Sequence, residues 1–159
     1  MMGRPFIDLA FLKKSEVVNG RIKYNRIKTG ALIDIKVSKE LEEFVTFYSR
    51  HKNETHFLLP ILGVEHKNDS KKQYNEYLSK RKTYNKHLEK VGKLLGIGEK
   101  LTSYVARHSF ASIANEMGVP LSAIKEMLNH QRISTTESYL KGLKSSILDD
   151  YNEKIIKGN

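Results

Sequence analysis

The sequence predicts an α+β fold that is mainly helical, with one small three-stranded antiparallel sheet near the N-terminus. Two observations lead to this prediction. Apolar and polar residues alternate only in the stretch that ends at Val37, and apolar residues recur at helical spacing in the segments that follow. A chain of 159 residues can bury a core of its own, so we expect a single domain over residues 1–159.

The first element is an apolar segment at 6–12. Phe6, Leu9 and Ala10 fall at helical spacing there, which indicates the last turns of a helix. Such a helix would be nearly complete at residue 4. We therefore expect a chain that is truncated at its N-terminus and normally has further sequence in front of it.

The sheet follows, and its three strands are expected at 17–18, 22–26 and 33–37. One face of the two longer strands is predicted to carry Ile22, Tyr24, Arg26, Ile33, Ile35 and Val37. The pair Asn19-Gly20 is a strong hairpin-turn signal. The run Lys28-Thr29-Gly30 makes the second turn, which places Lys28 at the tip of the second hairpin.

Helices are expected through the rest of the chain, apart from an irregular stretch at 51–70. The six expected helices carry apolar faces, with Phe44 on the first, Tyr77 and Leu94 on the second, and Phe110, Ile113, Ala114 and Met117 on the third. These faces begin near Ser38, Tyr74, Tyr104, Leu121, Ser134 and Ser145. The second helix should end at Gly96. Residues 134–137 fit a capping box for a short helix that carries Tyr139 and ends at Gly142.

The balance of charge favours a polyanionic partner. The chain has 28 Lys and Arg residues against 18 Asp and Glu residues, a formal net charge of +10, and a pI of about 9.7. Charge alone does not distinguish between DNA, RNA and an acidic protein surface as this partner. The absence of cysteine excludes disulfides and thiolate zinc sites. No apolar run is long enough to span a membrane and no secretory signal is visible, so a cytoplasmic protein is expected.

Three polar residues of the C-terminal third stand out as candidates for chemistry. Arg107 shares a helix face with Ala111 and Ala114, and a guanidinium on such a small-residue side needs an anion. His130 follows an apolar run at a helix end, and Tyr139 lies nine residues later. Each also has a purely structural interpretation: a snorkelling arginine, a histidine at a helix C-terminus and a core tyrosine with a hydrated hydroxyl. Only the joint arrangement favours a functional site.

That arrangement resembles a known family. The segment 101–140, LTSYVARHSFASIANEMGVPLSAIKEMLNHQRISTTESYL, is similar to the C-terminal catalytic block of the tyrosine recombinases, the phage integrase family, and looks most like integrases of Bacteroides-type mobile elements. In that family an arginine opens a helix, a histidine follows, and the nucleophilic tyrosine comes nine residues further on. Arg107, His130 and Tyr139 match this order and spacing, with Asn129 where the family often has glycine.

The resemblance extends to the N-terminal half and implies further catalytic residues. The hairpin around Lys28 is similar to the family's β-hairpin with its catalytic lysine, and the opening residues are similar to its first-arginine region, which implies a role for Arg4. Two positions depart from the family's pattern. Tyr104 stands where a histidine is usual, three residues before the arginine, and could donate a hydrogen bond to a phosphate. Arg4 is about one position out of register, where Pro5 falls.

The resemblance implies the catalytic domain of a site-specific DNA recombinase or integrase, which cleaves and rejoins strands through a 3′-phosphotyrosine intermediate. Tyr139 would attack the phosphorus, Arg107 and His130 would bind phosphate oxygens, and Lys28 would be the general acid. Neither a cofactor nor a metal is expected, because the cationic side chains supply the electrostatic stabilisation that a metal would give.

The expected partners are double-stranded DNA and further copies of the chain, assembled as a homo-tetramer on two duplexes. Neither a membrane nor a small-molecule substrate is expected, and the protein would reside at the nucleoid of a bacterial cell. The core-binding domain that completes the DNA clamp in the family would be absent. Two alternatives remain open: a catalytically inactive DNA-binding remnant of an integrase, for which Tyr104 and the register of Arg4 argue, and a helical RNA-binding module, which rests on charge alone.

Overall fold

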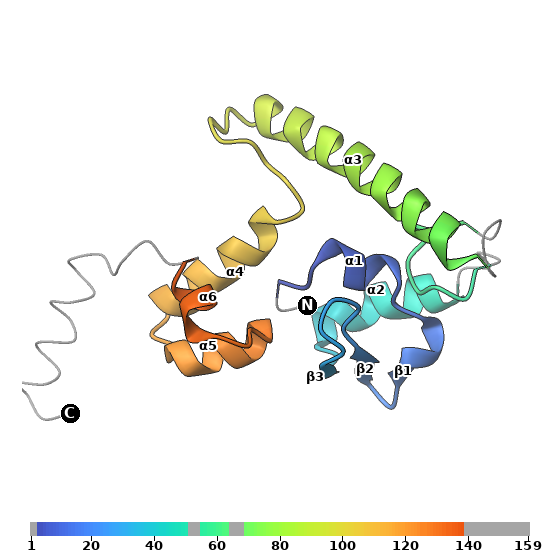
Figure 1. The fold of residues 1–159 in the computed structure, drawn as a ribbon, viewed down its shortest axis with the longest axis horizontal. Coiled ribbons are helices and arrows are strands. Elements are labelled where there is room, and N and C mark those ends of the chain that lie inside the picture. Colours follow the sequence, from blue (N-terminus) through green and yellow to red (C-terminus); the bar gives the residue numbers. More distant parts are fainter. Residues whose placement is uncertain (1–2, 51–54, 64–68, 139–159) are drawn as a thin grey trace, which may run out of the picture. The chain divides into compact units, whose positions relative to one another are not determined.

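The chain folds as two compact units, Gly3–Val105 and the segment that begins at Ala106, and the structure, a computed structural model, describes residues 3–50, 55–63 and 69–138 (Figure 1). The elements in chain order are α1 (Phe6–Ala10), a 3₁₀ turn (Lys14–Glu16), β1 (Val17–Val18), β2 (Arg21–Asn25), β3 (Leu32–Lys36), α2 (Lys39–Arg50), α3 (Ser70–Leu94), α4 (Val105–Glu116), α5 (Leu121–Leu128) and α6 (Ile133–Glu137). This mainly helical fold with one small sheet is the predicted one.

The three strands form the predicted antiparallel sheet in the order β1-β2-β3. Asn19 and Gly20 in the first turn both have positive φ, 50° and 69°, as a two-residue type I′ hairpin turn requires. The buried residues of the two longer strands face each other in pairs, Ile22 with Ile35 and Tyr24 with Ile33. Arg26, which continues the same alternation just after β2, is also buried. The predicted inner face of the sheet is therefore confirmed for these residues.

The start of the chain differs from the prediction. Helix α1 begins at Phe6, directly after Pro5, and is five residues long, so it is not the end of a helix that is nearly complete at residue 4. Proline lacks a backbone N–H and here has a φ of −60°, which suits the entry to a first helical turn. The core around α1 joins it to α3 and to the loop that precedes α3, through Ala10, Phe57, Leu62 and Tyr77.

The two long helices of the first unit start and stop near the predicted positions, but part of each apolar face is exposed. Helix α2 begins just after Ser38, and α3 ends shortly before Gly96, whose φ is 67°. Of the predicted stripe on α3, Tyr77 is buried whereas Leu94 is 86% exposed, and Phe44 on α2 is 64% exposed. The core of the unit lies near the start of α3, so the far end of this 25-residue helix extends beyond it.

The second unit is a cluster of short helices (Figure 1). Its buried apolar core consists of Ala111 and Ala114 from α4 and Ile124 and Leu128 from α5. The prediction that Ile113 and Met117 would face inward is wrong, since they are 55% and 76% exposed. The buried side of α4 carries these two alanines together with Arg107.

Helix α6 begins two residues earlier than the predicted cap at Ser134 implies. Its first residue is Ile133, and Arg132 precedes it without a side-chain cap, so the capping box expected from Ser134 does not form. Ser134 already lies in the first turn, where its carbonyl accepts a hydrogen bond from the Ser138 amide at 3.1 Å. The predicted end of this helix at Gly142 and the helix predicted from Ser145 lie outside the described residues.

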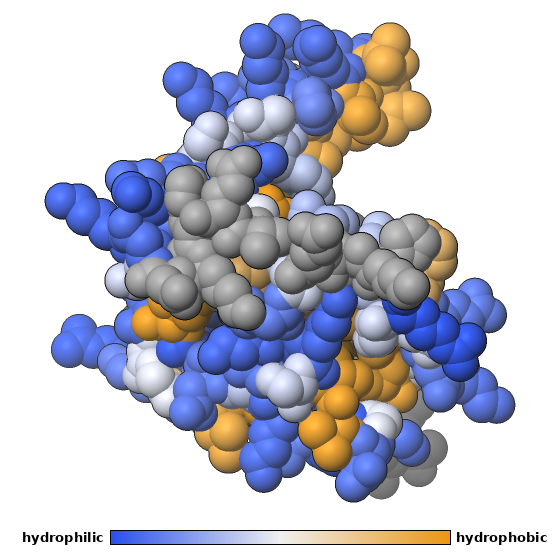
Figure 2. Space-filling model, turned by 90° about the vertical axis from the view of Figure 1, so that its right-hand side faces the viewer, coloured by the Kyte–Doolittle hydropathy of each residue, from blue (hydrophilic) through white to orange (hydrophobic). Residues whose placement is uncertain are grey.

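Polar side chains dominate much of the surface. Figure 2 shows hydrophilic residues over most of the visible face and hydrophobic ones in separate patches. In the described part of the chain, no helix combines the length and the apolar character that a membrane crossing requires. Within the same ranges, no three His, Cys, Asp or Glu side chains gather in a way that could hold a metal ion.

Candidate functional site

Arg107 is held in the buried side of α4. Only 2% of this residue is exposed. Its Nη2 donates a hydrogen bond to the backbone carbonyl of Leu128, the last residue of α5. The same Nη2 lies 2.9 Å from Nε2 of His130. The expectation that this guanidinium lies on the small-residue side of its helix is confirmed, and its planar group reaches the C-terminal end of the neighbouring helix.

The turn that carries His130 is shaped by a left-handed residue. Asn129 has φ 54° and ψ 53°, a conformation that commonly ends helices and that asparagine tolerates better than most residues. The His130 amide donates to the carbonyl of Lys125 at 3.0 Å, and the Asn129 amide donates to that of Glu126 at 2.9 Å. Because asparagine tolerates this left-handed conformation, it can occupy a position where glycine is frequent. The turn places the imidazole beside Arg107.

Thr136 holds the opposite side of the His130 ring. Its Oγ1 lies 2.9 Å from His130 Nδ1, and the threonine is fully buried in α6. A guanidinium can only donate hydrogen bonds, so Nε2 accepts from Arg107 and the proton of a neutral imidazole resides on Nδ1. The Nδ1–H group then donates to the Thr136 hydroxyl. The three side chains thus form one hydrogen-bonded series across α4, the turn after α5, and α6.

Lys28 is exposed at the tip of the β2–β3 hairpin, as predicted. The Arg26 amide donates to the Ala31 carbonyl at 3.0 Å, and the Gly30 amide donates to the Arg26 carbonyl at 2.8 Å. Gly30 has a φ of 68°, which residues with a side chain rarely adopt. These two bonds close the loop that carries Lys28 directly beyond the last strand pair.

A buried polar cluster lies at the base of this hairpin. Asp8 of α1 is buried, and its Oδ2 accepts hydrogen bonds from Arg26 Nε at 3.2 Å and from the Tyr24 hydroxyl at 3.4 Å. Its Oδ1 accepts from the backbone N–H of Ile27 at 3.4 Å. Burial raises the pKa of Tyr24 above its ordinary value and the charge of Asp8 adds to the rise, whereas Arg4 and Arg26 oppose it. Arg4 is itself buried and belongs to this cluster electrostatically.

The structure thus brings two of the six predicted site residues into direct contact, Arg107 and His130. Arg4 and Lys28 both belong to the first unit, one in the buried cluster and the other at the hairpin tip. Tyr139 lies outside the described residues.

Tyr104, the remaining predicted residue, is 50% exposed and directly precedes α4. Two further residues were missed by the sequence-based reasoning, Thr136 and Asp8. A signal for Asp8 was present, because the strand alternation turns Arg26 inward and a buried guanidinium calls for an acidic partner. The sequence holds no comparable signal for Thr136, which is an unspecified position inside the predicted capping box.

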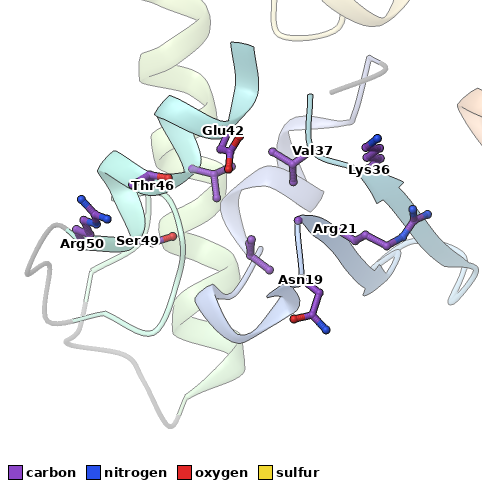
Figure 3. Close-up of a pocket in the computed structure, with 11 residues that line it drawn as sticks. Asn19, Arg21, Lys36, Val37, Glu42, Thr46, Ser49 and Arg50 are labelled. Atoms are coloured by element: carbon purple, nitrogen blue, oxygen red, sulfur yellow. The ribbon is translucent and has the colours of Figure 1, made fainter. Parts of the chain in front are cut away.

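A hollow of the first unit lies between the β1–β2 turn, the end of β3 and α2 (Figure 3). Arg21 and Lys36, which are cross-strand neighbours, stand toward one end and Arg50 toward the other (Figure 3). Arg21 Nε also lies 2.5 Å from Asp34 Oδ1. None of the predicted site residues is among the described residues that line this hollow, so it adds basic surface but no predicted catalytic group.

Comparison with known proteins gives a consistent assignment. A model described as the phage integrase family matches residues 8–145. The tyrosine recombinase XerC of Rickettsia canadensis (strain McKiel) is 43% identical over 58 residues, which are 36% of this chain and 19% of the relative. The tyrosine recombinase XerD of Staphylococcus saprophyticus is 47% identical over 57 residues, again 36% of this chain and 19% of the relative. The matched segment is thus about a fifth of the length of these curated relatives.

Solved structures share the fold. The XerA recombinase aligns over 96% of this chain and 53% of its own, with a TM-score of 0.67 at 20% identity. The XerH site-specific recombinase bound to its difH substrate aligns over 97% of this chain and 46% of its own, with a TM-score of 0.59 at 15% identity. A lambda integrase dimer bound to a core site aligns over 90% of this chain and 52% of its own, with a TM-score of 0.52 at 15% identity. The chain therefore spans about half the length of these solved relatives.

Proposed function

The chain belongs to the phage integrase family, and from this membership we propose that it is the catalytic part of a site-specific tyrosine recombinase. It cleaves and rejoins DNA strands, with Tyr139 as the nucleophile and a 3′-phosphotyrosine as the intermediate. The observation that carries this proposal is the 2.9 Å contact between Arg107 Nη2 and His130 Nε2. Two residues that the family pattern selects, 23 positions apart, meet in one partly buried cluster.

The proposed step exchanges one phosphoester for another. Tyr139 Oη attacks the phosphorus, the bond between phosphorus and the 5′-oxygen breaks, and the protein–DNA ester preserves the bond energy for rejoining without ATP. Arg107 binds two non-bridging oxygens with its planar fork, a geometry that lysine cannot copy. The Lys28 ammonium gives its proton to the leaving 5′-oxygen.

The proposed role of His130 follows from its tautomer. In the resting site Nε2 accepts from Arg107, so this nitrogen holds a lone pair. When the guanidinium turns to a phosphate, that lone pair can take the proton that the Tyr139 hydroxyl loses. The resulting imidazolium donates from Nε2 to a phosphate oxygen and from Nδ1 to Thr136.

Double-stranded DNA is the proposed partner. The net charge of +10 favours a polyanion, and two of the solved structures with this fold are complexes with DNA sites. We further propose a homo-tetramer on two duplexes, and residence in the bacterial cytoplasm at the nucleoid. The contacts of a single catalytic part with phosphates predict weak, strongly salt-dependent DNA binding by this chain.

The test traps the covalent intermediate. A pool of nicked duplexes with a randomised central sequence is incubated with the protein, and DNA that stays attached in detergent is recovered and sequenced. We expect adducts with the wild type and none with Tyr139→Phe. Tyr74→Phe is the matched control, because Tyr74 is an exposed tyrosine of α3 with no proposed role. Equal adduct formation by wild type and Tyr139→Phe would show that the nucleophile is assigned wrongly.

The alternative is an inactive DNA-binding remnant of an integrase. The observation that favours it is Tyr104, a phenol that stands where the family usually has the more basic imidazole of histidine. The same pool separates the two functions. A remnant would retain DNA in a filter-binding assay at low salt but would never give detergent-resistant adducts.

A further inference from the structure

We propose that Asp8 is a positioning residue for Lys28: it holds the base of the β2–β3 hairpin from inside the fold and thereby sets where the ammonium group points. This inference rests on the proposed function, in which Lys28 protonates the leaving oxygen. Asp8 touches no DNA in this proposal and acts only through the hairpin.

The geometry that supports it is the convergence of three donors on one buried carboxylate. Two donors are side chains of the inward face, Tyr24 and Arg26, at 3.4 and 3.2 Å from Oδ2. The third is the backbone N–H of Ile27, 3.4 Å from Oδ1. All three lie within four residues of Lys28, whereas Asp8 itself comes from α1. The carboxylate therefore ties a separate helix to both the strand end and the loop.

The contact with the Ile27 amide distinguishes this arrangement from an ordinary core ion pair. A buried ion pair alone is weak grounds for a stabilising role, since well-packed apolar residues often serve as well. A bond to the loop backbone, one residue before Lys28, restricts the direction in which the loop leaves the sheet. The backbone hydrogen bonds among Arg26, Ala31 and Gly30 close the loop. They therefore restrict the direction of the loop tip, where Lys28 lies, as well.

The orientation of Lys28 matters because its side chain is long and exposed. A general acid must lie within hydrogen-bond reach of the oxygen that it protonates. A displacement of roughly 1 Å of such a group can cost about 100-fold in rate. We therefore expect Asp8→Asn to slow DNA cleavage by about 100-fold.

The decisive experiment replaces the leaving 5′-oxygen of the trapped DNA sequence with sulfur. A thiolate leaves without a proton because thiols ionise far more readily than alcohols, so a lost or misplaced general acid no longer slows the reaction. The cleavage defects of Lys28→Ala and Asp8→Asn should both shrink to less than about 3-fold on this substrate if each variant lacks only general-acid assistance. A defect of Asp8→Asn that persists on the sulfur substrate, while that of Lys28→Ala disappears, would overturn the proposal.

Two controls separate positioning from damage to the fold. Asp34→Asn removes a carboxylate from the outer face of the same sheet, where Asp34 pairs with Arg21, and should leave cleavage of both substrates unchanged. Arg26→Lys keeps the charge beside Asp8 but loses the Nε contact, and should show a smaller defect that sulfur also relieves. If Asp8→Asn does not fold, Arg26→Lys replaces it in the test. Its cleavage defect should then disappear on the sulfur substrate, and a defect that persists there would overturn the proposal.

A measurement without DNA checks the anchoring itself. Amide hydrogen exchange at Ile27 and Gly30 should accelerate at least about 10-fold in Asp8→Asn, while the amides of the β2–β3 ladder keep their protection. Unchanged exchange at Ile27 would overturn the anchoring. If the wild type forms no adduct, the proposed function is wrong. If the wild type reacts and Asp8→Asn reacts equally well, only the positioning role of Asp8 is wrong.

Discussion

Arg26 in the first unit and Arg107 in the second are both buried, but they are held in different ways. Arg26 pairs with a carboxylate, with its Nε 3.2 Å from Asp8 Oδ2. The contacts of Arg107 with the Leu128 carbonyl and the His130 imidazole are with neutral acceptors. The described contact of Arg26 is thus an ion pair, whereas the two described contacts of Arg107 are hydrogen bonds to neutral groups.

This difference in contacts indicates which of the two buried arginines has a structural role. An ion pair in a buried site is costly to break, because the partner that remains is an uncompensated charge. Hydrogen bonds to neutral groups contribute less and can be exchanged for bonds to a phosphate, which are assisted by charge. The first arrangement suits a fixed support for the Lys28 hairpin, and the second suits a group that must rearrange around a substrate.

The largest expected effect is on the stability of the first unit. Asp8→Asn should lower the free energy of unfolding by about 3–5 kcal/mol, because the Arg26 charge then remains buried without its counter-ion. Asp34→Asn, on the exposed face of the sheet, should cost about 0–1 kcal/mol. Urea unfolding of both variants measures the difference. Equal losses would show that the buried cluster is no more important than a surface pair.

The next effect is on chemistry rather than stability. Arg107→Lys should reduce the rate of covalent adduct formation by about 100- to 1000-fold, since a single ammonium cannot bind two phosphate oxygens as the fork does. Arg132→Lys, just before α6 and exposed, is the matched control and should stay near the wild-type rate. A wild-type rate for Arg107→Lys would remove this arginine from the proposed mechanism.

The same two regions show how far sequence alone reaches. Strand alternation predicted the inward positions of Ile22, Tyr24 and Arg26, because a period of two follows from backbone geometry and needs no knowledge of neighbours. The partner of Arg26 comes from a helix 18 residues away, and no local pattern specifies such a tertiary pair. The sequence therefore does not predict the contact of Asp8 with Arg26, although it predicts correctly that Arg26 faces inward.

In the second unit the family pattern selected Arg107 and His130, and the structure brings them together. Thr136 is an unspecified position inside the predicted capping box, but α6 starts two residues early and the Thr136 side chain contacts the imidazole. The predicted apolar face of α4 is confirmed for Phe110 and Ala114 but wrong for Ile113 and Met117. Hydrophobicity favoured Ile113, whereas close packing on α5 selected the alanines.

A smaller effect is expected at the support of His130. Thr136→Val keeps the shape of the side chain but removes the acceptor of the Nδ1–H bond, so the ring loses its fixed orientation. Adduct formation should fall about 10-fold, and Thr136→Ser should restore most of the rate because it keeps the hydroxyl. Thr135→Val changes the exposed neighbour and serves as the control. A rate for Thr136→Val equal to that of Thr135→Val would argue against a role in orienting the imidazole.

The smallest expected effect is a change in the alkaline stability of the first unit. Burial and Asp8 raise the pKa of Tyr24 above its ordinary value of 10.0, so above this pH the phenol ionises in the unfolded chain while it stays neutral in the folded one. The stability that Tyr24 contributes is therefore present below pH 10 and is lost as the pH rises further. The limiting slope for one group is about 1.4 kcal/mol per pH unit, so the loss should be below about 1 kcal/mol near pH 10.5.

Urea unfolding between pH 9 and about pH 10.5 measures this slope. Tyr24→Phe should flatten it, because phenylalanine has no proton to lose. Tyr24→Phe also removes one of the three hydrogen bonds to Asp8, so its stability at neutral pH should fall by about 1 kcal/mol. If Tyr24→Phe leaves the slope of unfolding free energy against pH unchanged, the cluster around Asp8 does not exclude the charged phenol. The environments of the two buried arginines would then differ less than their contacts indicate.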